Sequence, residues 1–236
     1  MAGILFIISA PSGSGKSTLV SQLLTLVERI DFSISYTTRP PRGSETNGRE
    51  YHFTTREEFL RMVDNNEFLE WAEVFGNYYG TAASALDQAR EQGRDLLLDI
   101  DVQGALQVMT KLPKAVSIFV LPPSPQVLEM RLRNRSQAEH MTVESVIERR
   151  LSEAREELKH LHHYRYALVN DILDQAATEL RAIVLTERSN TGDVYAKIKF
   201  GTSDTLLPTA STIAASCRTS SPSPRLHTAL ANFKQS

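Results

Sequence analysis

Short apolar runs alternate with amphipathic segments along much of the chain. The runs are typical of buried strands, whereas apolar residues that recur every three or four positions are typical of helices. The expected strands cover residues 4–9, 95–100, 116–121 and 166–169, and the expected helices cover residues 16–29, 102–110, 142–162 and 172–188. This alternation predicts an α/β fold in which a parallel sheet is flanked by helices.

Residues 32–81 depart from this alternation and predict a small inserted subdomain of mixed structure. Short strand-like pieces occur at residues 32–35 and 51–53, and a further run covers residues 67–75. Between them Thr55, with a glutamate three positions later, forms a capping box, which marks the start of a helix.

Two other stretches lack both patterns. Residues 134–141 are polar and irregular, which favours a flexible flap. Residues 201–225 contain six Ser, five Thr and three Pro, and such a composition buries too little apolar surface to offset the entropy lost on ordering. We therefore expect a folded domain over residues 1–188 and a disordered tail over residues 189–236, in which only residues 226–234 form a short helical turn.

Composition places the chain among soluble globular proteins, because 41% of its 236 residues are hydrophobic and 23% are charged. The formal net charge of -2 argues against nucleic-acid and membrane partners, which favour basic proteins. The single cysteine, Cys217, cannot form an internal disulfide, and the apolar run at residues 4–8 is too short to cross a bilayer. These features predict a cytoplasmic location. An oligomer is compatible with the sequence, which does not specify one.

A glycine-rich loop follows the first expected strand directly. Its small residues let consecutive backbone N–H groups turn toward phosphate oxygens, and the helix that starts here adds its positive dipole end. Lys16 can reach the β- and γ-phosphates of a nucleotide, and the Ser17 hydroxyl can ligate Mg²⁺. Ala10 replaces the usual first glycine, which a negative φ tolerates. An ordinary strand-to-helix turn is the simpler alternative. Strand, spacing and helix together predict a loop that binds a nucleoside triphosphate, made of Ala10, Pro11, Ser12, Gly13, Ser14, Gly15, Lys16 and Ser17.

Arginines and carboxylates occur near other expected strands. Arg39 and Arg42 lie on a segment stiffened by two prolines, where guanidinium groups can bind phosphate oxygens; a solvated basic loop is the alternative. Asp99 lies near the end of the strand expected at residues 95–100, and Asp101 follows this strand directly. Carboxylates at such strand ends position Mg²⁺ directly or through water in phosphate-loop proteins. Capping of the next helix is the alternative for this pair.

In their order and spacing, these motifs resemble guanylate kinase over about residues 3–188. The resemblance rests on the phosphate loop and on the segments SYTTRPPR at 35–42, NGREYHF at 47–53, EFLEWA at 67–72, GNYYGT at 76–81 and LDIDVQG at 98–104. It implies transfer of the γ-phosphoryl group of ATP, with Mg²⁺, to GMP or dGMP in purine nucleotide metabolism. It also implies a P-loop kinase core over residues 1–31 and 82–188, a GMP-binding subdomain over 32–81 and a helical lid over about 124–160.

The resemblance assigns residues to the acceptor. The guanine would be contacted by Ser35, Glu70, Thr81 and Asp101, and the GMP phosphate would be held by Arg39, Arg42, Tyr51 and Tyr79. Glu70 also fits on chemical grounds, because a carboxylate can accept from both N1–H and N2–H of guanine, whereas adenine offers a bare N1 acceptor there. We therefore expect the site to reject AMP. A solvated or surface-paired Glu70 is the alternative.

Arginines flank the expected flap, and Arg131, Arg135 and Arg150 match the family's lid arginines. The segment Asn134-Arg135-Ser136 departs from the usual Gly-Arg-Gly. We choose Arg150 over Arg149 because its helical position lies beside the apolar stripe, whereas most other arginines here fit a solvated helix face.

The remaining roles follow from the same resemblance. Asn170 matches a family position near the adenine of ATP; the alternative is an ordinary turn residue. Arg131 is also expected to bind ATP. The acceptor is a phosphate oxygen that is already largely anionic, so no protein nucleophile is required. The expected catalytic residues are Lys16, Arg39, Asp101, Arg135 and Arg150.

Two other functions and one other site are compatible with parts of the sequence. Guanylate-kinase-like domains also serve as inactive phosphopeptide-binding modules. Such modules usually lack a working phosphate loop, whereas this chain keeps Lys16 and Ser17. A kinase of another small phosphorylated acceptor is the second alternative, against which Glu70 argues because it suits a base. The histidines at 160, 162 and 163 suggest a metal, but a polar helix end explains them better.

Overall fold

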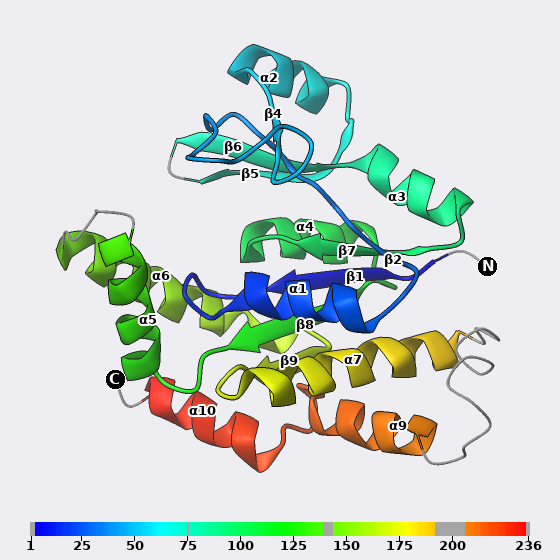
Figure 1. Cartoon of the computed structure of the whole chain (residues 1–236), viewed down its shortest axis with the longest axis vertical. Helices are drawn as coiled ribbons and strands as arrows, with labels where there is room; N and C mark the ends of the chain where they lie inside the picture. The colour runs from blue at the N-terminus through cyan, green and yellow to red at the C-terminus, as the bar shows by residue number, and fades with distance from the viewer. Residues whose placement is uncertain (1–2, 75, 139–143, 192–205, 235–236) are drawn as a thin grey trace. The chain divides into compact units, whose positions relative to one another are not determined.

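The computed structural model describes residues 3–74, 76–138, 144–191 and 206–234, apart from the side chains of residues 135–138 and 206–208. The chain, drawn in Figure 1, divides by its internal contacts into two compact units, each of which is described by itself. The first consists of Met1–Ile7 and Arg29–Ala115, and the second of Ile8–Glu28 and Val116–Ser236.

A five-stranded sheet has the strand order β2-β7-β1-β8-β9. Its strands are β1 (Leu5–Ser9), β2 (Ile30–Phe32), β7 (Asp95–Asp99), β8 (Val116–Leu121) and β9 (Tyr166–Val169). Every residue of β1, β8 and β9 is buried, as expected for a sheet with both faces covered. The pairings of β2 with β7 and of β8 with β9 are parallel. The predicted α/β fold with a parallel sheet is therefore confirmed.

In the second unit, helix α1 (Lys16–Leu26) lies against α7 (Leu173–Asn190), and α5 (Pro125–Ala138) lies against α6 (Glu144–Lys159). The irregular flap expected at residues 134–141 is wrong for residues 134–138, which form the last turn of α5. Arg133 supports this part of α5, because it pairs with Glu129 one turn earlier and with Glu144 of α6. The rest of the expected flap lies outside the described residues.

In the first unit, a second, mixed sheet has the order β4-β3-β6-β5. Its strands are β3 (Tyr36–Thr37), β4 (His52–Phe53), β5 (Phe68–Val74) and β6 (Asn77–Ala82). The rings of Phe68 and Tyr78 stack on Phe59 of α2 (Arg56–Asp64), with centroids 4.5 and 5.4 Å away. The Thr55 hydroxyl accepts from the Glu58 amide at 3.1 Å, so α2 begins where the sequence predicts. Helices α3 (Ala83–Glu91) and α4 (Val102–Lys111) complete the unit.

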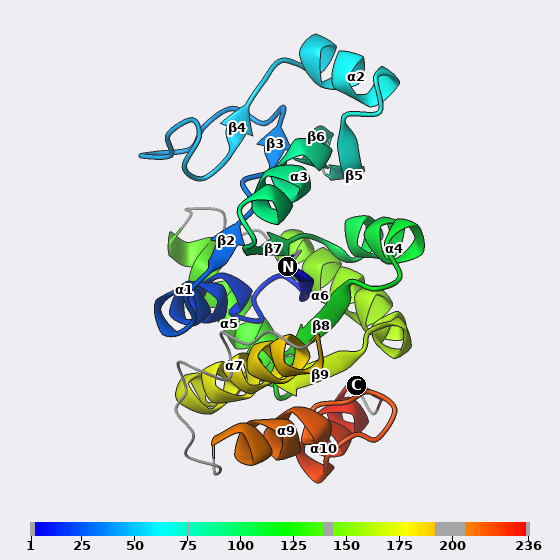
Figure 2. The ribbon, with the colours of Figure 1, turned by 90° about the vertical axis from the view of Figure 1, so that its right-hand side faces the viewer.

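The C-terminal segment differs from the predicted disordered tail, although the short helical turn predicted at residues 226–234 is confirmed. It forms α9 (Leu206–Ser216) and α10 (Pro224–Lys234), which lie against α7 and β9 respectively (Figures 1 and 2). Although the segment is rich in Ser and Thr, it contains apolar residues at helical spacing. Those that are buried include Ala210, Ala214, Leu226 and Ala229. Residues 192–205 of the expected tail lie outside the described residues.

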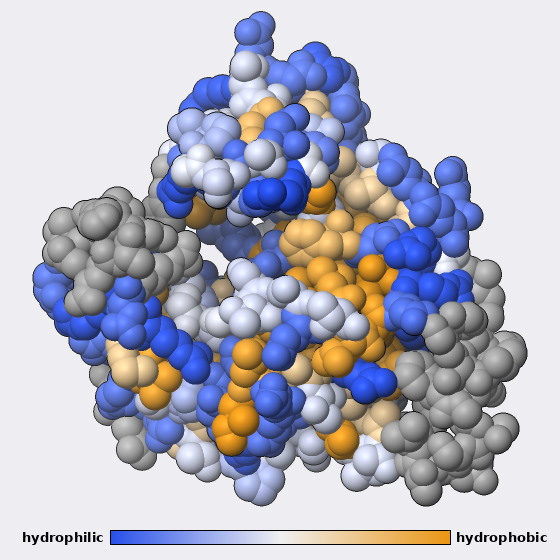
Figure 3. Space-filling view, in the orientation of Figure 1, coloured by the Kyte–Doolittle hydropathy of each residue, from blue (hydrophilic) through white to orange (hydrophobic). Residues whose placement is uncertain are grey.

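Among the described helices, none is long and apolar enough to span a membrane. Large apolar side chains that reach the surface include Met130, Ile172 and Leu26. Apolar patches are also visible among hydrophilic residues on the face that Figure 3 shows.

Candidate active site

The glycine-rich loop joins β1 to α1 in the second unit. Its turn is closed by the Ser14 amide, which donates to the Pro11 carbonyl at 3.0 Å. Gly13 and Gly15 have φ angles of 86° and 81°, in the left-handed region that glycine occupies most readily. Gly15 is the N-cap of α1 and provides no side-chain acceptor, so no cap occupies the first N–H groups of the helix. Such a helix start suits an anion.

Lys16 and Ser17 form the first turn of α1, and Ser17 is exposed. Ala10 is not among the described residues with a positive φ, so the condition that lets its methyl group replace glycine is met. The backbone at Ala10, Gly13 and Gly15 therefore agrees with a phosphate-binding loop.

Asn170 and Arg131 both bind the main chain of this loop. Asn170 follows β9 and is buried, and its side-chain amide donates to the Ser14 carbonyl at 2.8 Å. Arg131 donates to the same carbonyl at 3.4 Å and to the Asn170 carbonyl at 2.9 Å, and burial lowers its pKa. A Cβ atom on Gly15 would lie 2.6 Å from the Asn170 amide nitrogen. The two predicted ATP-binding residues thus lie together at the loop.

The first unit brings three of the four predicted guanine contacts together. Glu70 on β5 is only 3% exposed, so the alternative of a solvated or surface-paired carboxylate is wrong. Thr81 on β6 is its cross-strand partner, and the Thr81 hydroxyl is buried with no hydrogen bond among the described residues. Burial raises the pKa of Glu70 to about 7; the charge of Asp101 adds to the rise, and the backbone amide of Thr81 opposes it.

Asp101 is the N-cap of α4, because its carboxylate accepts from the Gly104 amide at 2.7 Å. Helix capping, the alternative weighed for this carboxylate, therefore occurs. Asp99 is half-buried at the end of β7, and its charge helps to raise the pKa of Tyr51, after the larger effects of burial and Tyr79. Ser35, the fourth predicted guanine contact, accepts through its carbonyl from the His52 amide at 2.9 Å.

Arg39, Tyr51 and Tyr79, which are predicted to hold phosphate, also lie close together. The Arg39 guanidinium is buried and lies 5.3 Å from the Tyr51 ring centroid, and the Tyr51 and Tyr79 rings are 5.9 Å apart. Arg42 is exposed, so it fits the solvated alternative better than Arg39 does.

Glu45 is a functional candidate that the sequence reasoning missed. Its carboxylate accepts from the Arg39 guanidinium at 2.9 Å and from the Arg42 amide at 2.7 Å. The Glu45 contact is the main cause that raises the pKa of Arg39, and Arg39 lowers the pKa of Glu45. The only signal in the sequence was a carboxylate six positions after Arg39.

The lid arginines are only partly described. Arg149 pairs with Glu153 at 3.6 Å on the exposed face of α6, whereas Arg150 is half-buried near the stripe that contains Ile147 and Ala154. The side chain of Arg135 lies outside the described residues. The roles predicted for Arg135 and Arg150 stay predictions.

A parallel α/β sheet with this loop at the carboxyl end of its first strand defines a phosphate-loop nucleotide-binding protein. Residues 3–187 match the family model of guanylate kinase. The guanylate kinase of Koribacter versatilis is 58% identical over 188 residues, which are 80% of each chain. That of Nitrosospira multiformis is 51% identical over 189 residues, 80% of this chain and 88% of the relative.

A solved structure agrees with these relatives. The crystal structure of guanylate kinase from Anaplasma phagocytophilum is 36% identical, with a TM-score of 0.64 over 79% of this chain and 86% of that one. The chain belongs to the guanylate kinase family, whose members are ATP:GMP phosphotransferases. The resemblance inferred from the sequence motifs is confirmed.

Proposed function

We propose that this chain transfers the γ-phosphoryl group of ATP to GMP or dGMP, with ADP and GDP or dGDP as the products. Family membership supports the reaction. Within the structure, the observation that carries the choice of acceptor is the buried carboxylate of Glu70, beside Thr81 and Asp101. A buried acceptor needs donors, and guanine brings N1–H and N2–H side by side.

The donor half of the site belongs to the second unit. The loop amides and Lys16 would bind the ATP phosphates, and Asn170 and Arg131 would hold the loop at the adenine side. Mg²⁺ in kinases keeps several waters and takes phosphate oxygens together with one or two protein groups. The exposed hydroxyl of Ser17 at the start of α1 fits that role. A role for Asp99 through water rests on the resemblance to phosphate-loop proteins alone. When bound, the ion would neutralise phosphate charge.

The acceptor half belongs to the first unit. The GMP phosphate would accept hydrogen bonds from Arg39, Arg42, Tyr51 and Tyr79. Of these, Arg39, Tyr51 and Tyr79 lie close together. The bond between the γ-phosphorus and its bridging oxygen breaks, and a bond to an anionic oxygen of GMP forms. That oxygen needs no general base, because the second phosphate pKa is about 6. Lys16, Arg39, Arg135 and Arg150 would neutralise the charge in transfer.

The two alternative functions are less well supported. An inactive phosphopeptide-binding module does not require the loop conformation described above, and a sugar phosphate does not supply the paired donors that Glu70 requires. The cytoplasmic location and the lack of a nucleic-acid or membrane partner stay predictions from composition.

A coupled assay of ADP release tests the proposal. With ATP and Mg²⁺, we expect fast turnover with GMP, slower turnover with dGMP and little with AMP, UMP or ribose phosphate. Equal rates with AMP and GMP would contradict the guanine assignment. Tight phosphopeptide binding without ADP release would favour the inactive module instead.

Gly104 provides a sharper test of the guanine pocket. A Cβ atom at this buried position of α4 would lie 2.4 Å from Glu70 Oε2, so alanine must displace the carboxylate. Alanine otherwise favours a helix by about 1 kcal/mol over glycine. We therefore expect Gly104→Ala to raise the KM for GMP about tenfold without loss of stability.

Steady-state kinetics and urea unfolding check this expectation. The matched control is Gln103→Ala, an exposed neighbour on the same helix turn, which should leave both quantities nearly unchanged. An unaltered KM for GMP in Gly104→Ala would mean that the position of Glu70 does not matter for GMP.

A further inference from the structure

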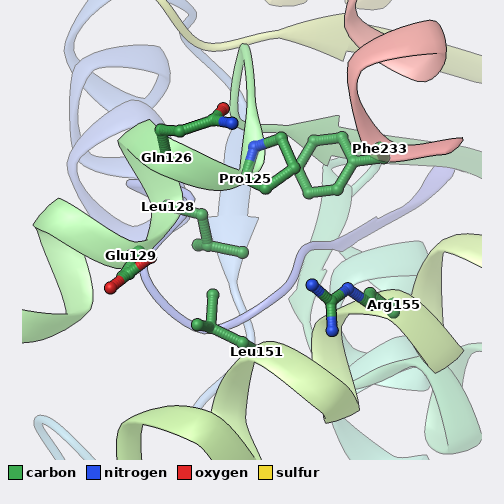
Figure 4. A pocket seen from close by; sticks show the side chains of 7 residues that line it. All are labelled: Pro125, Gln126, Leu128, Glu129, Leu151, Arg155 and Phe233. Carbon is green, nitrogen blue, oxygen red and sulfur yellow. The ribbon is translucent and has the colours of Figure 1, made fainter. Parts of the chain in front are cut away.

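The C-terminal segment of residues 206–234 lies outside the family match, which ends at residue 187. It nevertheless packs on the second unit at several points. Phe233 of α10 joins the apolar cluster of Leu128 and Leu132 on α5, and Asn232 donates to the Pro123 carbonyl at 3.1 Å. Figure 4 shows the Phe233 ring directed at Pro125 beside a small pocket of about 120 Å³. The segment is thus a built part of this unit.

Arg225, in the first turn of α10, makes several hydrogen bonds to the rest of the second unit. Its guanidinium donates to the Val169 carbonyl at 2.5 Å, to the Asp171 carboxylate at 3.3 Å through Nε, and to the Glu179 carboxylate. The Arg225 side chain is 24% exposed. One guanidinium therefore joins the end of β9, the residue two positions later and a carboxylate of α7.

The residue between the two loop contacts of Arg225 is Asn170. Its side chain donates to the Ser14 carbonyl of the phosphate loop at 2.8 Å, and its amide donates to the Leu121 carbonyl at 2.7 Å. Arg225 and the phosphate loop are thus linked through residues 169–171: Arg225 binds Val169 and Asp171, and Asn170, which lies between them in the chain, binds Ser14. This link lies within one unit and at the carboxyl ends of β8 and β9, where ligands bind in parallel α/β sheets.

We propose that Arg225 is a positioning residue for ATP, which holds residues 169–171 so that Asn170 fixes the phosphate loop. The inference rests on the proposed function, in which Asn170 and the loop bind ATP. Without Arg225, the Val169 carbonyl and the Asp171 carboxylate lose a shared cationic donor, and the turn that carries Asn170 gains freedom. ATP binding must then order this turn, which lowers affinity for ATP but not for GMP.

Arg218 of the same segment provides a matched control. It lies over the Tyr166 ring, 4.9 Å from the centroid, and 3.8 Å from the Glu187 carboxylate. Tyr166 begins β9, whereas Val169 ends it. Arg218 and Arg225 thus attach the segment to the same strand at opposite ends, and only Arg225 is next to Asn170.

The experiment compares Arg225→Met, Arg218→Met and Asn170→Ala in the full chain by steady-state kinetics and urea unfolding. We expect Arg225→Met to raise the KM for ATP about five- to tenfold, with the KM for GMP within about twofold. Arg225→Lys should restore part of the affinity for ATP. Arg218→Met should lower the urea midpoint but leave both KM values within about twofold.

Three outcomes overturn the inference. An unchanged KM for ATP in Arg225→Met, while Asn170→Ala raises it, removes the positioning role and leaves the donor site intact. An unchanged KM for ATP in Asn170→Ala means that the donor-site assignment itself fails. Equal rises in both KM values for Arg225→Met and Arg218→Met indicate a structural role only. If Arg225→Met does not fold, Asp171→Asn tests the same inference, because this variant is also expected to raise the KM for ATP selectively.

Discussion

Replacing Glu70 by alanine is expected to raise the KM for GMP about 100-fold, because two hydrogen bonds to a buried charged acceptor are lost. The KM for ATP should stay within about twofold, since Asn170, Arg131 and the phosphate loop belong to the other compact unit. Glu70 is 3% exposed, so water does not easily replace its carboxylate as the acceptor for the guanine N–H groups.

Steady-state kinetics with GMP and AMP measure this effect. Glu73 lies on the same strand and is exposed, so Glu73→Ala is the matched control and should behave like the wild type. If Glu70→Ala leaves GMP kinetics unchanged, the guanine is bound elsewhere. If Glu70→Ala raises the KM for ATP as much as the KM for GMP, the substitution has damaged the fold.

The pH dependence provides a second readout of Glu70. Burial raises the pKa of Glu70 to about 7 from 4.5, and only the ionised form accepts from both guanine donors. The KM for GMP should therefore fall as the pH rises through about 7. The GMP phosphate also titrates, with a pKa of about 6, so Glu70→Gln is needed to separate the two. The Glu70 component should vanish in Glu70→Gln while the phosphate component remains.

The same pKa sets the sign of a stability effect. Since the folded pKa is raised, the protonated carboxyl favours the folded state fully below about pH 4.5, and this contribution is lost as the pH rises through about 7. Wild type should therefore lose stability relative to Glu70→Gln over that range. Urea unfolding at several pH values measures the difference.

Motifs whose chemistry depends on local backbone could be predicted from the sequence. The buried runs predict the strands, and the phosphate loop needs only short-range geometry at Gly13 and Gly15. Contacts made by folding could not be predicted in this way. The closeness of Gly104 to Glu70 depends on how α4 packs on β5, and the Arg225 contacts depend on α10 lying beside β9.

The C-terminal segment shows the same limit for a whole element. Its content of Ser, Thr and Pro favours disorder when averaged, yet Leu226 and Ala229 are three positions apart and both are buried. Composition averages over a window, whereas burial depends on which few residues face a partner surface. The helical turn predicted at residues 226–234 lies within α10, whereas α9 was not predicted from the sequence.

Replacing Arg39 by methionine is expected to lower kcat/KM for GMP at least about 100-fold, because a buried guanidinium that would pair with phosphate is removed. Arg39 is 6% exposed and already pairs with the Glu45 carboxylate at 2.9 Å. The buried Arg39 guanidinium therefore already holds one anionic group, as expected of a side chain that would bind phosphate. Arg39→Lys keeps the charge but not the planar fork, and we expect a loss of about tenfold.

The comparison with Arg42 makes this prediction specific. Arg42 is exposed, so water screens its charge, and Arg42→Met should cost only about two- to fivefold in kcat/KM for GMP. Urea unfolding checks that Arg39→Met is folded, and Glu45→Gln shows how much of any instability comes from the unpaired carboxylate. A loss in Arg42→Met as large as that in Arg39→Met would mean that burial does not decide which arginine holds the phosphate.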